Sequence, residues 1–139
     1  MRLWHKFLIS ALPREQLVAQ WRECSAIAGS IQTKGTPNHI LVNKVLDYDF
    51  DHFITYSKLI RDEMTSRNYR TMNSVWDKIV SLKPNWEEVS FDNLYREWMN
   101  NEYFVICYFN LLEKYRCSGI RLEDWTKISN LFSDFFPNK

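Results

Sequence analysis

The chain has 139 residues, of which 45% are hydrophobic and 16% aromatic, enough apolar material for one buried core. Its three glycines and four prolines exclude collagen, flexible linker proteins and sandwiches dense in turns, so helices are the expected elements. The net charge of +1 argues against a surface coated with cations for indiscriminate nucleic-acid binding.

The charge is unevenly distributed along the chain. Residues 1–46 carry a net charge of +4 and residues 47–139 carry −3. A cationic surface for an anionic partner is therefore expected in the first third of the sequence. The alternative is an ordinary fluctuation of surface charge.

Cysteine and histidine spacing predicts neither a disulfide framework nor a metal site. Cys24, Cys107 and Cys117 form no CxxC pair, and the three histidines are scattered. No stretch approaches eighteen uninterrupted apolar residues, and the N-terminal residues lack a signal-peptide pattern. We therefore expect a cytoplasmic protein with reduced thiols, no cofactor, no metal and no membrane contact.

The predicted elements begin with a short irregular N-terminal arm. Pro13 is expected as the first residue of a long helix, because its missing N–H is one that a helix does not use. Gln20 and Glu23 fall on the polar face of this helix, and turn-forming residues at 33–38 predict a loop after it. The core stripe recurs every three or four residues and consists of Leu17, Trp21, Cys24, Ala28 and Ile31.

Four further helices are expected, and no alternation of period two predicts a strand. Asn68 can end the first of them in a left-handed conformation, and Ser90 can cap the third. The sequence thus predicts a single all-α domain over residues 1–139. The four helices are placed over residues 51–68, 74–82, 90–115 and 122–135.

The most specific pattern lies in residues 1–24, where MRLW at the start is followed by LPREQLVAQWREC. It continues through His39-Ile40-Leu41-Val42-Asn43 and the helix end at residues 63–69. Over about half the chain, mainly residues 1–70, the sequence resembles the pyrimidine-dimer DNA glycosylase family, of the phage endonuclease V type and its bacterial relatives. The resemblance implies a compact helical domain whose N-terminal arm lies against the first helix.

The resemblance also implies a DNA glycosylase with AP lyase activity, acting on damaged bases such as pyrimidine dimers through an imine with the N-terminal amine. An α-amino group titrates at about 7.7–8.0, well below a lysine, so more of it is nucleophilic near neutrality. Met1 is expected to supply this amine, because Arg2 is too large for ordinary removal of the initiator Met. Glu23 matches the family's catalytic carboxylate, which stabilises the cationic sugar and assists proton removal.

The expected partner is damaged double-stranded DNA, bound by a monomer. Arg2 and Arg22 match family residues that lie beside the nucleophile and contact phosphate. His39 and Asn43 match the bacterial relatives, either as DNA contacts or through loop hydrogen bonds. Lys34 adds a cation to the same third of the chain.

Departures from the family pattern leave alternatives open. Ser25 and Ala26 stand where the phage type carries a basic residue, so we expect a weaker grip on phosphate. A non-catalytic helical module that binds nucleic acid or protein is the main alternative, and a hydrolase that uses Cys24 is a third. Trp21 is expected in the core, whereas Trp4 can serve either packing or DNA contact.

Overall fold

The structure, a computed structural model, describes residues 1–136, and these form only helices and loops. The all-α fold class predicted from the sequence is confirmed. Two 3-10 helices, η1 (Lys6–Ala11) and η2 (Asn43–Asp47), precede the first and second α-helices. The α-helices of the described range are α1 (Arg14–Lys34), α2 (Phe50–Ser66), α3 (Asn73–Val80), α4 (Asn101–Arg116) and α5 (Leu122–Phe135).

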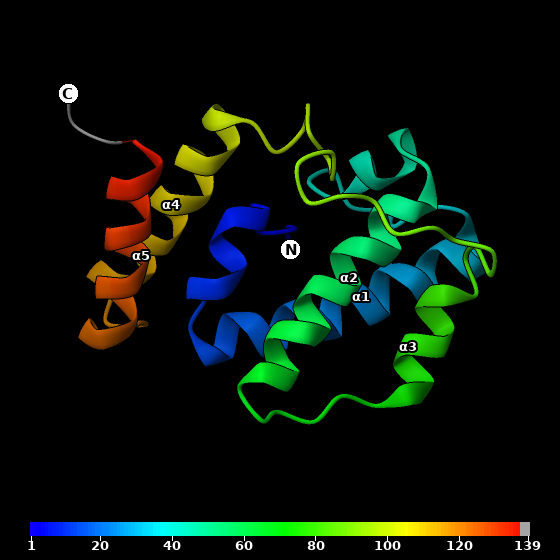
Figure 1. Ribbon diagram of the computed structural model, residues 1–139, viewed down its shortest axis with the longest axis horizontal. Coiled ribbons are helices and arrows are strands. Elements are labelled where there is room, and N and C mark those ends of the chain that lie inside the picture. The colour runs from blue at the N-terminus through cyan, green and yellow to red at the C-terminus, as the bar shows by residue number, and fades with distance from the viewer. Residues whose placement is uncertain (137–139) are drawn as a thin grey trace.

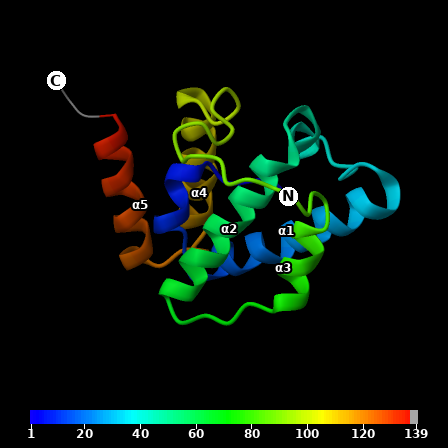
Figure 2. The same ribbon diagram turned by 45° about the vertical axis from the view of Figure 1, so that its right-hand side comes forward.

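The helices are arranged in two groups with the N-terminal arm between them. Figure 1 shows α1, α2 and α3 packed on one another and α4 paired with α5. Figure 2, turned about the vertical axis, shows the same separation of the two groups. Because η1 contacts both α2 and α5, the arm joins the groups into one hydrophobic core.

The arm belongs to this core and is more regular than predicted. Leu3, Leu8 and Leu12 are at most 1% exposed, and Trp4, whose role the sequence left open, is also buried. A buried segment must pair its backbone groups internally, and the 3-10 turn does so, since Leu8 N donates to His5 O at 2.8 Å.

The long helix α1 agrees with its predicted stripe and differs at its start. All five residues of the stripe, including Trp21, are buried. Pro13 is extended, with ψ of 158°, so it precedes the helix as its N-cap and Arg14 is the first helical residue. Gly35 ends α1 in the left-handed conformation, with φ of 76°, which glycine adopts without steric cost.

The helix predicted from Ser90 begins only at Asn101. Tyr95 has a positive φ of 48°, which interrupts any helix through this segment. Its backbone N–H donates to His52 Nδ1 at 3.1 Å, so a tertiary contact replaces the helical hydrogen bond. The Asn100 side chain then caps α4 by accepting from Tyr103 N at 2.9 Å.

The ends of α2 and α3 follow the predictions within a few residues. Asp49 caps α2 by accepting from Asp51 N, so the helix starts one residue earlier than expected. Asn68 adopts the left-handed conformation predicted for it, with φ of 65°. The start of α3 has no side-chain cap, because Met72 and not Ser74 occupies the capping position.

Candidate active site

A single glutamine joins the N-terminal arm to α1. The Gln20 side chain is completely buried, although the sequence placed it on the polar face of the helix. Its Oε1 accepts a hydrogen bond from Trp4 N at 2.8 Å and lies 2.9 Å from the Tyr56 hydroxyl oxygen, whose single proton is directed to the closer Trp4 O. Its Nε2 donates to Arg2 O and to Glu23 Oε2, both at 2.9 Å. The start of the chain is therefore held beside Glu23.

The Glu23 carboxyl group is half-buried at this junction. Burial raises its pKa, while the N-terminal amine of Met1, the Arg22 guanidinium and the Gln20 hydrogen bond lower it to a smaller extent. No ion pair joins the amine to this carboxyl group in residues 1–136, and the start of the chain is held near Glu23 by the hydrogen bonds of Gln20 to Arg2 O and Glu23 Oε2. Met1 is 46% exposed, so the start of the chain is accessible to solvent.

Arg2 lines the site on the side of α4. Its guanidinium lies 5.8 Å from the centre of the Trp4 ring, within cation–π range. Burial raises the pKa of Tyr103 and of Cys107, and the nearby Arg2 opposes both effects. The Tyr103 hydroxyl donates to Leu3 O, which ties α4 to the arm.

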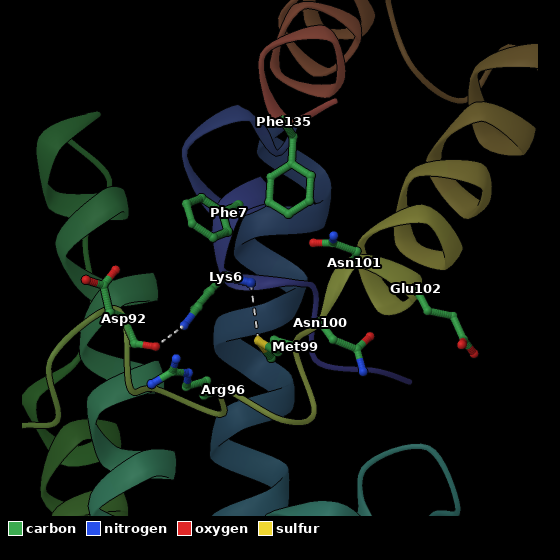
Figure 3. A pocket seen from close by; sticks show the side chains of 9 residues that line it. All are labelled: Lys6, Phe7, Asp92, Arg96, Met99, Asn100, Asn101, Glu102 and Phe135. Atoms are coloured by element: carbon green, nitrogen blue, oxygen red, sulfur yellow. Dashed lines mark hydrogen bonds between the residues drawn. The ribbon is translucent and has the colours of Figure 1, made fainter. Parts of the chain in front are cut away.

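Lys6 anchors the other end of the arm to the segment before α4. Its Nζ donates to Phe91 O at 2.6 Å, to Leu94 O at 2.8 Å and to Asp92 O at 3.3 Å. Figure 3 shows this ammonium pointing toward Asp92, and the Lys6 backbone nitrogen pointing toward Met99 Sδ. The contacts of Lys6 hold the arm in place, and burial lowers its pKa.

Arg22 lies next to Glu23 on α1 and is exposed to solvent. Among the ion pairs of residues 1–136, none includes Arg2 or Arg22. Met1 and Arg22 thus influence the Glu23 carboxyl group, and Arg2 is joined to the same site through its backbone carbonyl, while neither guanidinium group has an ion-pair partner in the described residues. Such groups can bind the oxygens of a phosphate in pairs. That Met1, Arg2, Arg22 and Glu23 form one catalytic site stays a prediction.

The other predicted DNA-binding residues lie at the far end of α1. Lys34 is the last residue of the helix, about 16 Å from Glu23 along the axis at the usual helical rise. Asn43 Oδ1 accepts from His39 N at 3.0 Å, and His39 Nδ1 accepts from Leu41 N at 3.2 Å. These contacts close the loop after α1; whether His39 and Asn43 also contact DNA stays a prediction.

The hydrolase alternative based on Cys24 is wrong. This thiol is fully buried, and burial raises its pKa to about 12, so it is neither accessible nor ionised near neutrality. Within residues 1–136, no three His, Cys, Asp or Glu side chains are grouped so that they could hold a metal ion. None of the helices described there combines the length and the apolar composition that a membrane span requires.

Residues 1–77 match a family of DNA glycosylases, enzymes that act on DNA. The family is described as pyrimidine dimer DNA glycosylase, and the chain belongs to it, because the match spans more than half of the sequence. No curated protein and no solved structure matches the chain. The matched region includes the arm, α1, α2 and most of α3, whereas α4 and α5 lie outside it.

Three residues that organise the site were not predicted. A signal existed for Gln20, which lies three residues before Glu23 and therefore on the same side of α1. Tyr56 reaches the arm from α2, and its hydroxyl donates to Trp4 O at 2.6 Å. Tyr103 bonds to a residue 100 positions earlier in the chain, and no local pattern announces such a contact.

Proposed function

We propose that the protein removes damaged bases, such as pyrimidine dimers, from double-stranded DNA and then cleaves the strand as an AP lyase. The observation that carries the proposal is that Gln20 Nε2 donates to both Arg2 O and Glu23 Oε2, which holds the start of the chain beside the carboxyl group. The family membership supports the glycosylase activity, and the open position of Met1 supports its role as nucleophile.

The first chemical step uses the amine. Its nitrogen attacks C1′ of the damaged nucleotide, and the bond from C1′ to the base breaks with its electron pair leaving on the base. The nitrogen then loses a proton and its lone pair forms a C=N bond to C1′, while the C1′–O4′ bond breaks with its electron pair on O4′, which takes up a proton. The product is a protonated imine between the protein and the opened sugar. The Glu23 carboxylate stabilises the positive charge that develops on the sugar.

The second step cleaves the strand by β-elimination. Glu23 accepts a proton from C2′, the electron pair of that C–H bond forms a C2′–C3′ double bond, and the 3′ phosphate leaves with the electrons of the C3′–O bond. Water then hydrolyses the imine and releases the amine. The partial burial of Glu23 favours the proton transfer from C2′, because it raises the pKa of the carboxyl group above its usual value.

DNA is held by cations around the amine. Arg2 and Arg22 bind phosphates that flank the lesion, and Lys34, His39 and Asn43 contact the duplex farther along α1. Damaged bases stack and pair poorly, which lowers the cost of moving the nucleotide out of the duplex. Ser25 and Ala26 add no cation between the two ends of α1, so binding should depend strongly on the remaining arginines.

Borohydride reduction in the presence of an abasic-site duplex tests the proposal. We expect a covalent protein–DNA adduct that mass spectrometry maps to the nitrogen of Met1. Acetylation of that nitrogen should abolish both the adduct and strand cleavage. DNA binding without any adduct would instead support the non-catalytic module, and normal cleavage by acetylated protein would exclude the amine as nucleophile.

A further inference from the structure

The hydrogen bonds of Gln20 fix which way its amide group is oriented. Both donor hydrogens on Nε2 are used, and Oε1 accepts from Trp4 N and lies 2.9 Å from the Tyr56 hydroxyl oxygen. Trp4 N can only donate and Arg2 O can only accept, so exchanging the amide oxygen and nitrogen would break both contacts. Because the side chain is completely buried, water cannot substitute for a lost partner.

The Nε2 atom of Gln20 thus links the two halves of the candidate site. One hydrogen bond holds the carbonyl of Arg2, one residue from the chain's first nitrogen, and the other holds Glu23 Oε2. Within residues 1–136 no hydrogen bond is made to Glu23 Oε1. The amide therefore occupies one carboxylate oxygen and leaves the other available to a substrate.

We propose that Gln20 is a positioning residue for the reaction: its Nε2 sets the placement of the N-terminal amine relative to Glu23 and directs Oε1 of Glu23 toward the sugar. This inference rests on the proposed function. Gln20 touches neither the substrate nor the reacting atoms, and it acts through the two groups that do. An N–H that donates to a carboxylate also favours its ionised form, so the amide keeps Glu23 able to accept a proton.

The charged and titratable groups around Glu23 determine how a change at Gln20 alters the pKa of the Glu23 carboxyl group. The amine of Met1 lies on the side of the arm, and Arg22 and the neutral thiol of Cys24 are its neighbours on α1. Both cations favour the carboxylate, so the Gln20 hydrogen bond acts in the same direction as they do. Its loss should move the titration of Glu23 to higher pH.

Gln20→Glu is the most direct test. The new carboxylate can still accept from Trp4 N, but it places an acceptor where Nε2 donated to Arg2 O and Glu23. We expect the single-turnover rate of strand cleavage, measured at saturating protein on an abasic-site duplex, to fall by roughly tenfold to hundredfold near neutral pH. The acid limb of the rate profile should also move to higher pH.

A second variant and a matched control separate this role from a general loss of stability. Gln20→Met removes the donor without adding charge and should give the same direction of shift. Gln32→Glu makes the same chemical change at an exposed position of α1, about 14 Å from Glu23 along the axis at the usual helical rise, and should keep the wild-type midpoint. If the Gln20 variants cleave at the wild-type rate with an unmoved acid limb, the inference is overturned.

One measurement needs no variant of Gln20. In the NMR spectrum of the intact protein, the side-chain amide protons of Gln20 should shift with the titration of Glu23, and this shift should disappear in Glu23→Gln. Amide chemical shifts that stay constant through the titration of Glu23 would contradict the proposed link between Gln20 and Glu23. Failure of the wild-type protein to form a borohydride adduct would refute the proposed function instead, so the two failures are distinguishable.

Discussion

At the scale of single residues, Glu23 is placed between opposing influences. Partial burial disfavours its charge, while the amine of Met1 and the guanidinium of Arg22 favour it. A carboxyl group in this position can change its protonation state during a reaction more readily than an exposed glutamate. The same cations that favour the carboxylate also face the solvent from which DNA would approach.

Glu23→Gln should separate chemistry from binding. The amide retains the size of the side chain but can neither accept the C2′ proton nor balance the charge of the sugar. Strand cleavage should fall by at least about a hundredfold, while the affinity for an abasic-site duplex stays close to that of the wild type. Glu15→Gln changes the same charge at an exposed position of α1 and serves as the control. Unchanged cleavage would remove Glu23 from the mechanism.

Arg22→Ala should lower the affinity for DNA by a similar factor whatever the DNA sequence. An exposed guanidinium that binds one phosphate releases about one counterion, so the slope of log affinity against log salt concentration should decrease by about 1. Titration of a labelled duplex at several salt concentrations measures this change. Arg116, an exposed cation at the opposite end of α4 from the site, provides a control that should leave the slope unaltered.

At the scale of secondary-structure elements, one ammonium group connects η1 to the segment before α4. Lys6→Met would leave the carbonyl groups of Phe91, Asp92 and Leu94 without their donor. We expect a loss of about 1–3 kcal/mol in the free energy of unfolding, because the buried Leu94 carbonyl would be left without a partner and two partly buried carbonyls would lose their donor. Hydrogen exchange should increase in residues 90–100.

Lys58→Met provides the comparison for Lys6→Met, because Lys58 makes exposed ion pairs with Asp62 and Glu88. Such pairs contribute at most about 1 kcal/mol, so this variant should remain close to the wild type in urea unfolding. Equal losses in the two variants would contradict the anchoring role of Lys6.

The elements also show which structural features the local sequence predicts and which depend on contacts between distant residues. The stripe of α1 and the left-handed Asn68 follow from spacing and residue type, and both were predicted. The start of α4 was not, because Tyr95 N bonds to a histidine of α2 and distant contacts hold the segment in turns. The burial of Gln20 was not predicted for the same reason, since periodicity cannot foresee an arm whose backbone groups bond to the polar face of α1.

At the scale of the whole molecule, His5 couples folding to pH. Burial lowers its pKa from 6.5 to about 4. The neutral ring bonds to Met99 O at 2.8 Å through Nε2 and accepts from Phe7 N at 3.2 Å through Nδ1. The unfolded chain therefore binds the proton at higher pH than the folded chain does, so acid favours unfolding.

The free energy of unfolding should consequently fall as the pH decreases from 6.5 to about 4 and level off below that. The His5 contribution is about 3 kcal/mol for a pKa difference of this size, and burial of His52 lowers its pKa in the same direction. Urea unfolding between pH 4 and 7 measures the slope. His5→Gln should flatten it and the loop variant His39→Gln should not; a full slope in His5→Gln would exclude this assignment.

The start of the chain is held from both sides of the boundary at residue 77: Gln20 and Tyr56 lie within the matched residues 1–77, whereas Tyr103, Met99 and the carbonyls around residue 92 follow them. The stretch that identifies the family therefore shares the support of its first residues with the segment before α4 and with α4 itself. Transplanted alone onto another scaffold, it would keep the contacts of Gln20 and Tyr56 but lose those of Lys6 and Tyr103. A substitution in the C-terminal half can thus displace the first residues without changing the stretch by which the family is recognised.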